Sequence, residues 1–315
     1  MRKERRKIRR YRQVARISLL LIALVWGATF TLTKIALSHV PVFPFLFVRF
    51  VVATIVLVGI LILTSGHRRP MNARTVWVGV FLGCLLFGAY AFQTMGLGHT
   101  SPAITGFLTG LYVVLVPLFS IPLFHTAPPR RTWLGAILAV MGLAFISGSH
   151  ILHMQIGDME VLICAVFLAL QILFIEKYGG NIQALTLATI EIGVVSVLSL
   201  MMSLLLRQTA LFTPQVWLEP AVLWSVLINA IFGTALAYWG QNIFQQNLPS
   251  AQIAVIFSME PVFAALVAWM VQGSLLSSIE MVGGFLIFIS MLVADPHVSW
   301  INLPGRRSHS ELSQR

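Results

Sequence analysis

Glu260 is the residue whose type and position offer the most chemistry in this chain. It lies in the middle of the apolar segment 251–272 and directly precedes Pro261. If this segment crosses a membrane, a carboxylate at its centre costs about 2.5–3.5 kcal/mol on insertion scales, so it should face protein or water. Pro261 has no N–H to donate to the carbonyl of Phe257, which is left free for another partner. The sequence therefore predicts a proton or cation position in a broken helix, or a hydrogen-bonded glutamate that bridges helices.

Two tyrosines and two glutamines recur at a fixed distance along the chain. A shift of 148 residues places Tyr90 on Tyr238 and Gln93 on Gln241 without a gap. A spacing of three puts each tyrosine on the same helical face as its glutamine. Tyrosine brings a flat ring with a hydroxyl, and glutamine brings two donors and an acceptor. These pairs could bind an organic metabolite, or they could join helices by hydrogen bonds.

Further polar and aromatic residues in apolar segments complete the candidate set. Tyr112 falls opposite Glu260 under the same shift, so we expect both to approach one cavity from opposite sides. Trp26 and Thr29 lie within the first apolar segment, where the indole could cap a cavity, pack, or sit in an aromatic belt. The predicted substrate-binding residues are Trp26, Thr29, Tyr90, Gln93, Tyr112, Gln171, Tyr238, Gln241 and Glu260.

Four other charged residues lie inside or at the ends of apolar segments. Glu191 is the second candidate, beside Glu260, for binding a coupling ion, and it is expected to pair with Arg49 across the halves of the protein. Lys34 and Arg49 could attract an anionic group, although Lys34 is expected to reach the membrane surface with its amine. Glu176 directly precedes Lys177 and is expected to be solvated.

The remaining reactive residue types do not predict a metal, a cofactor or a catalytic group. Cys84 and Cys164 lie in apolar runs without metal-ligand or disulfide spacing, and we interpret them as packing residues. The histidines at segment ends and in loops form no metal-binding spacing. The sequence also has no glycine-rich phosphate loop with a lysine, so ATP hydrolysis is unsupported. The prediction is a protein that is not an enzyme.

The elements that must position these side chains are apolar and helical. Hydrophobic residues make up 58% of the 315 residues and charged residues 10%, whereas about a quarter of an ordinary soluble domain is charged. A bilayer crossing needs roughly 20 apolar residues, and long apolar runs without alternation favour helices over strands. The sequence predicts an all-α integral membrane protein with ten transmembrane helices, at 17–38, 45–64, 75–97, 103–124, 132–149, 157–176, 184–206, 221–241, 251–272 and 279–294.

Loop charge predicts how these segments are oriented. With ten crossings, 18 of the 21 basic residues fall on one side, and the other side has only Arg207. The positive-inside rule then places both termini in the cytoplasm of a multi-pass protein of the cytoplasmic (inner) membrane. The basic stretch MRKERRKIRRYRQVAR could be a nucleic-acid arm. A flank that sets topology and touches anionic lipid headgroups is the preferred interpretation, and no nucleic-acid partner is predicted.

The repeat divides the chain into two halves of five crossings each. The expected parts are a basic cytoplasmic tail (1–16), a first repeat (17–149), a second repeat (157–294) and a C-terminal cytoplasmic tail (295–315). Because five is odd, the second copy enters the membrane from the opposite face. The halves are therefore expected to be inverted about a two-fold axis in the membrane plane, an arrangement that suits alternating access.

Several stretches of the sequence resemble the ten-helix EamA-type members of the drug/metabolite transporter superfamily. They are LVWGATFTLTKIAL (24–37), PFLFVRF (44–50), AYAFQTMGLGHTSPAITGFLTGLYVVLVPLF (89–119) and GTALAYWGQNIFQQNLPSAQIAVIFSMEPVFAALVAW (233–269). The resemblance covers nearly all of 17–294 and implies two EamA repeats, ten helices, a central cavity and movement of small metabolites, often outward. The glutamate common in this family after the fourth and ninth helices is absent from FHTAPPRR and VQGSLLSS.

Together these features predict a secondary, gradient-driven transporter that exports amino acids or related small metabolites by alternating access. The expected partners are a small-molecule substrate, the lipid bilayer and protons, with the chain acting as a monomer or a homodimer. Two alternatives remain open: a drug or toxic-compound exporter of the same fold, and a membrane-embedded lipid-modifying enzyme. The enzyme would need a base beside a deep acid, and neither Glu191 nor Glu260 has an evident one.

Overall fold

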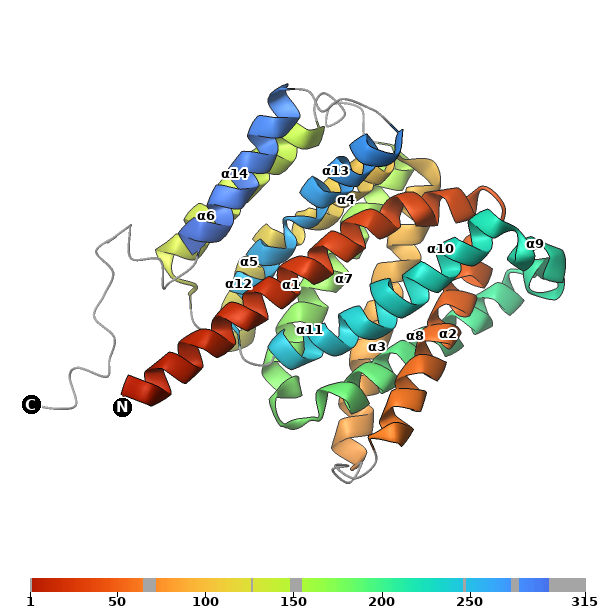
Figure 1. Cartoon of the computed structure of the whole chain (residues 1–315), viewed down its shortest axis with the longest axis horizontal. Helices are drawn as coiled ribbons and strands as arrows, with labels where there is room; N and C mark the ends of the chain where they lie inside the picture. The colour runs from red at the N-terminus through yellow and green to blue at the C-terminus, as the bar shows by residue number, and fades with distance from the viewer. Residues whose placement is uncertain are drawn as a thin grey trace, which may run out of the picture.

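The computed structural model describes residues 2–64, 72–125, 127–147, 155–245, 248–272 and 278–294. Within these ranges the chain forms helices and no strand, so the all-α prediction is confirmed (Figure 1). The predicted C-terminal tail, 295–315, lies outside the described residues. Helix α1 already begins at Arg2, so residues 2–16 of the predicted N-terminal tail (1–16) are helical.

The helices follow the apolar segments closely. They are α1 (Arg2–Leu37), α2 (Val42–Leu63), α3 (Ala73–His99), α4 (Pro102–Gly110), α5 (Tyr112–Phe124), α6 (Arg130–Ser147), α7 (Ile156–Tyr178), η3 (Gly179–Asn181), α8 (Ala184–Leu205), η4 (Thr209–Phe212), α9 (Pro214–Leu218), α10 (Pro220–Ala230), η5 (Ile231–Leu236), α11 (Ala237–Gln245), α12 (Ser250–Phe257), α13 (Glu260–Gln272) and α14 (Ser278–Ala294).

The length and composition of these helices suit a bilayer. In the described part of the chain, eight helical stretches are long and apolar enough to cross a membrane, and a shorter apolar helix covers Met281–Ala294. The count of ten crossings stays a prediction. Large apolar side chains such as Leu63, Trp224 and Phe285 are exposed on the outside of the bundle. Contact of this apolar surface with lipid is favourable, whereas its exposure to water would be unfavourable.

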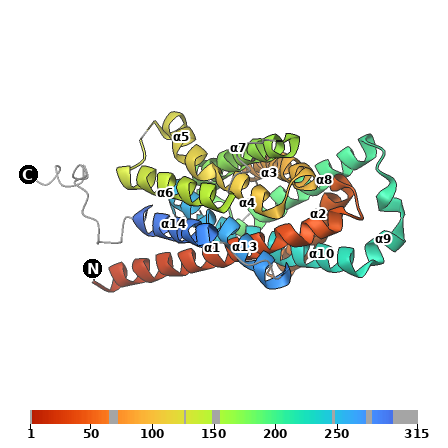
Figure 2. The ribbon, with the colours of Figure 1, turned by 90° about the horizontal axis from the view of Figure 1, so that it is seen from above.

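Helices α6 and α14 reveal how the two halves are related. A Cβ atom at Gly142 would lie 2.5 Å from the carbonyl oxygen of Gly283, and one at Gly135 would lie 3.1 Å from that of Ser290. The two helices are thus antiparallel, and they lie side by side in Figures 1 and 2. The 148-residue shift exchanges the two contacts. Equivalent helices that run antiparallel are related by a two-fold axis perpendicular to them, as in inverted repeats.

Both halves contain a helix that is broken at the same repeat position. The first break is at Leu111, between α4 and α5, and the second is at Ser258 and Met259, between α12 and α13. The shift of 148 places Leu111 on Met259. Pro261, the second residue of α13, accounts for the second break as predicted. In the first half the nearest following proline, Pro117, lies inside α5, six residues after Leu111.

Two charged side chains, Lys34 and Glu176, bind backbone groups where the broken helices α4/α5 and α12/α13 begin. Lys34 Nζ donates to the carbonyl oxygens of Leu97 (2.7 Å), Gly98 (2.9 Å) and Thr100 (3.0 Å), just before α4 begins. Its amine therefore closes the end of α3, where helix carbonyls lack partners and carry partial negative charge.

Glu176 has the corresponding place in the second half, since a shift of 142 residues places Lys34 on it. It is exposed, as expected for a solvated residue, but its Oε2 also accepts from the N–H of Ser250 at 2.8 Å. Ser250 begins α12, whose first N–H groups have no partner within the helix. The two ties thus hold equivalent broken helices with side chains of opposite charge.

We expect Lys34→Met to destabilise the protein by about 1–3 kcal/mol, because three backbone acceptors lose a charged donor. Thermal unfolding of the purified protein in detergent would show this as a lower midpoint. Lys177→Met is the matched control, since Lys177 Nζ makes one longer bond of 3.4 Å to the carbonyl of Leu123. Equal midpoints for the two variants would contradict the prediction.

Candidate functional site

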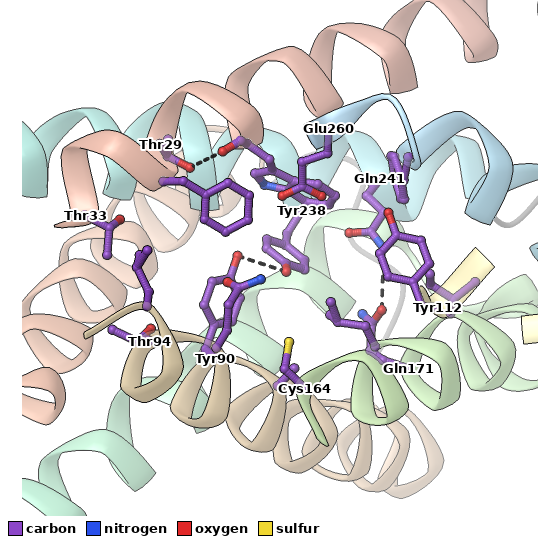
Figure 3. Close-up of a pocket in the computed structure, with 18 of the residues that line it drawn as sticks. Thr29, Thr33, Tyr90, Thr94, Tyr112, Cys164, Gln171, Tyr238, Gln241 and Glu260 are labelled. Atoms are coloured by element: carbon purple, nitrogen blue, oxygen red, sulfur yellow. Dashed lines mark hydrogen bonds between the residues drawn. The ribbon is translucent and has the colours of Figure 1, made fainter. Parts of the chain in front are cut away.

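One polar cavity lies between the two halves, close to both helix breaks. Its volume, including the open mouth, is about 670 Å³. Side chains reach it from α1, α2, α3, α5, α7, α11, α12 and α13 (Figure 3). The residues that line it are Trp26, Thr29, Phe30, Thr33, Arg49, Ala89, Tyr90, Gln93, Thr94, Leu97, Tyr112, Cys164, Leu168, Gln171, Ile172, Tyr238, Gln241, Phe257 and Glu260.

The structure brings all nine predicted substrate-binding residues to this cavity. Tyr112 and Glu260 line it together, as the repeat alignment suggested. Glu191 does not line it. That residue is fully buried on α8, and its Oε2 accepts a long bond of 3.5 Å from Asn242 Nδ2. Of the two predicted coupling-ion residues, only Glu260 faces the cavity.

Tyr90 and Tyr238 meet at the centre of the cavity. The Tyr238 hydroxyl donates to the Tyr90 hydroxyl at 3.0 Å, and the ring centroids are 6.1 Å apart (Figure 3). Because these tyrosines are equivalent residues of the two repeats, their contact lies on the two-fold axis. The cavity is therefore built around the axis on which the halves exchange roles.

Arg49 supplies a buried positive charge beside Tyr90. Its side chain is 4% exposed, with Cζ 4.7 Å from the centre of the Tyr90 ring. Nε donates to Thr234 Oγ1 at 2.9 Å and Nη2 donates to the Tyr90 hydroxyl at 3.3 Å. Within the described ranges no carboxylate lies within 4.0 Å of Arg49, so the predicted pairing with Glu191 is wrong. Arg49 instead donates to Thr234 and Tyr90, and Glu191 accepts from Asn242, all of which are uncharged.

Glu260 supplies the negative charge of the cavity. It is the first residue of α13 and is 7% exposed, and no described residue forms a hydrogen bond or ion pair with its carboxylate. The N-terminus of a helix favours negative charge, which gives this carboxylate partial compensation. In Figure 3 it points into the cavity, toward Tyr238. The bridging alternative, a glutamate hydrogen-bonded to a neighbouring helix, therefore gains no support.

Three polar groups on the Glu260 side also lack partners among the residues described. They are the Tyr112 hydroxyl, Gln171 Nε2 and Gln241 Oε1, all of them buried. Gln241 Nε2 donates to Gln245 Oε1 at 2.7 Å and approaches Gln171 Oε1 at 3.5 Å. Buried polar groups in proteins are normally satisfied, so this set indicates a place for a ligand or water.

A π-helical turn, η5, shapes the wall near Trp26. The indole N–H of Trp26 donates to the carbonyl oxygen of Gly233 at 2.9 Å, and the Thr29 hydroxyl donates to the Trp26 carbonyl at 2.8 Å. Trp26 also packs edge-on against Phe257, with centroids 4.9 Å apart. Elsewhere in the lining, Gln93 Nε2 donates to Thr109 Oγ1 at 3.2 Å.

Sequence reasoning missed several lining residues. The sequence indicated that Arg49 could attract an anionic group but did not place it in the cavity, and it did not single out Thr33 and Thr94. Thr33 follows Thr29 by four residues, and Thr94 follows Tyr90 by four, so helical spacing from chosen residues could have found both. Cys164, interpreted as a packing residue, is fully buried and also lines the cavity. The described residues contain no group of three His, Cys, Asp or Glu side chains that could hold a metal ion.

An apolar helical bundle with two inverted repeats and a polar cavity on their axis is the architecture of a multi-pass membrane transporter. Sequence comparison agrees with this class. The model of the EamA-like transporter family matches residues 14–148 and 155–294. The chain belongs to this family.

Individual relatives align along most of the chain. An uncharacterized transporter of Archaeoglobus fulgidus is 32% identical over 91% of this chain and 87% of its own length. The uncharacterized inner membrane transporter YedA of Escherichia coli is 24% identical over 90% and 92%. A solved crystal structure with 19% identity superimposes with a TM-score of 0.72 over 92% of this chain and 100% of its own, which supports the fold alone.

Proposed function

We propose that this protein is a gradient-driven transporter that exports amino acids or related small metabolites. The observation that carries the proposal is the polar cavity on the axis between the repeats, which contains a Glu260 carboxylate without a partner among the described residues. Exchanging the conformations of two inverted repeats would turn a cavity that opens to one face into one that opens to the other. The breaks at equivalent positions of α4/α5 and α12/α13 give each half a place to bend.

Glu260 offers a physical basis for coupling to protons. Its carboxylate can hold a proton or the cationic group of a substrate, but one position cannot hold both. If a proton displaces the substrate on the outer side and the substrate displaces the proton on the inner side, export of one requires import of the other. Each proton that moves down a potential of 100 mV supplies about 2.3 kcal/mol.

The proposed setting is the cytoplasmic membrane, with both termini in the cytoplasm, as the distribution of basic residues favours. The lining residues come from both repeats of one chain, so each copy would hold a cavity of its own. The proposal covers a monomer or a homodimer of such complete units. The repeats at 17–149 and 157–294 would be the two units that move against each other.

A drug or toxic-compound exporter is the second candidate. The aromatic and aliphatic part of the lining favours it, in particular Trp26, Phe30, Phe257 and Leu168. Such side chains bind apolar compounds with little geometric demand. A lipid-modifying enzyme has less support, because Glu260 is the only acid among the lining residues and no histidine accompanies it.

Transport by the purified protein in lipid vesicles tests the proposal. Vesicles loaded with each labelled amino acid, and separately with a cationic dye, would be placed in a more acidic medium. We expect faster efflux of at least one amino acid than from protein-free vesicles, together with acidification of the interior. Efflux of the dye alone would favour the second candidate. No efflux of any solute under either direction of the gradient would contradict both.

A further inference from the structure

We infer that the cavity binds a zwitterion, with its carboxylate at Arg49 and its ammonium group at Glu260. The inference rests on the proposed function and deepens it by assigning a charged group of the substrate to each half of the protein. Arg49 belongs to the first repeat and Glu260 to the second.

Arg49 is equipped to bind a carboxylate. A guanidinium has five N–H donors in a planar fork and stays charged in proteins. The two hydrogen bonds that Arg49 makes with described residues use Nε and Nη2, so neither involves the N–H groups of Nη1, which could bind a ligand. A charge this deeply buried is costly without an anionic partner. A carboxylate would meet the fork and neutralise it.

Glu260 and its neighbours are equipped to bind an ammonium group. Such a group has three N–H donors, as on lysine. In the described part of the chain the Glu260 carboxylate is one acceptor without a partner, and the Tyr112 hydroxyl and Gln241 Oε1 are two more that face the same side of the cavity. An ammonium group there would satisfy three acceptors at once. A neutral apolar ligand would leave all three unsatisfied.

The two charges share one cavity without pairing with each other. Both side chains lie within the described part of the chain, and no ion pair within 4.0 Å joins them. The contact between Tyr90 and Tyr238 lies beside Arg49 and Glu260 and occupies the centre. A ligand with one charge would leave the opposite protein charge buried and unpaired, which is strongly unfavourable. A zwitterion pairs both charges and adds no net charge.

The rest of the ligand faces apolar side chains. Trp26, Phe257, Leu168 and Ile172 contribute to the lining, so the zwitterion is expected to carry an apolar group. Leucine and its derivatives are suitable probes. L-Leucinamide lacks the carboxylate, and N-acetyl-L-leucine lacks the ammonium group, while both keep the side chain.

Binding to the purified protein in detergent tests the inference without a gradient, so its result is independent of transport. Each of the twenty amino acids would first be screened at millimolar concentration for a rise in the unfolding midpoint. The amino acid that gives the largest shift, or leucine if several give the same shift, would then be used in labelled form. The unlabelled amino acid, its amide and its N-acetyl form would each compete with it for binding to the protein. We expect both derivatives to bind at least tenfold more weakly. Absence of any midpoint shift, or a derivative that binds as well as the parent, would overturn the inference.

Two variants assign the charges. In Glu260→Gln, the affinities for the amino acid and for its N-acetyl form should differ by no more than about threefold. In Arg49→Gln, the affinities for the amino acid and for its amide should differ by no more than about threefold. The reverse assignment, or unchanged preferences in folded variants, would overturn the proposed orientation. A variant that does not fold leaves the wild-type comparison to decide. Zwitterion binding without transport would uphold this inference and contradict the proposed function.

Discussion

Glu260→Gln is expected to abolish proton-coupled transport, with a fall in the initial rate on the order of 30-fold or more. Losing one partner of a buried charged contact costs about 2–5 kcal/mol, and each 1.4 kcal/mol is a tenfold change. Glutamine keeps the size of the side chain but cannot exchange a proton. No described residue donates to the carboxylate, so its replacement breaks no hydrogen bond of the fold.

The prediction also states how the transport rate depends on the pH gradient. In the wild type, export should accelerate as the outer medium becomes more acidic than the interior, because protons then enter through Glu260. In Glu260→Gln the remaining rate should not respond to the gradient. The measurement is labelled substrate efflux together with a pH-sensitive dye inside the vesicles.

Two further acids make the experiment specific. Glu160→Gln is the matched control, since Glu160 lies at the start of α7, contacts His99 at 3.3 Å and does not line the cavity. It should transport like the wild type. Glu191→Gln tests whether Glu191 or Glu260 couples transport to protons, because Glu191 is buried and does not line the cavity. If Glu191→Gln loses the pH response and Glu260→Gln keeps it, the coupling residue is Glu191.

The sequence predicted much of the cavity because polar side chains are costly in lipid. Tyr90, Gln93, Tyr238 and Gln241 lie in apolar segments, so they had to face protein or water. Their recurrence at one shift then placed them at equivalent points of two repeats. The structure adds that two of them touch, which locates the axis. Periodicity alone does not give that contact, because it depends on how the halves dock.

The features that could not be predicted depend on contacts with the backbone. Lys34 binds three carbonyl oxygens, and carbonyls are present at every residue, so no residue type marks them. The contacts of the π-helical turn at 231–236 could not be predicted for the same reason. Its Gly233 carbonyl and Thr234 hydroxyl accept from Trp26 and Arg49, which are distant in sequence. Charge matching between Arg49 and Glu191 failed because both had uncharged partners nearby.

Gly27→Ala is expected to abolish transport and to destabilise the protein by about 1–3 kcal/mol, the usual cost of overpacking a close contact. Gly27 is the point where α1 approaches the start of α13. A Cβ there would lie 2.6 Å from the carbonyl oxygen of Glu260 and 2.7 Å from the amide nitrogen of Ala264. Backbone atoms cannot turn aside as a flexible side chain can, so α13 must move and take Glu260 with it.

Gly59→Ala is the matched control for this effect. A Cβ at Gly59, four residues before the end of α2, would meet nothing within 4 Å, and alanine is the better helix former by about 1 kcal/mol. Gly59→Ala should therefore keep or raise the unfolding midpoint and transport normally. Unfolding in detergent and efflux from vesicles would be measured for both variants.

The two measurements also separate displacement of Glu260 from general loss of structure. If Gly27→Ala remains folded at the assay temperature yet loses the response to pH, the tight approach of α1 is what holds the carboxylate in the cavity. If it keeps both the wild-type midpoint and the wild-type rate, α1 and α13 do not approach this closely in the transporting protein. The proposed place of Glu260 between the halves would then be wrong, because that contact holds α1, which carries Trp26, against α13, which carries Glu260.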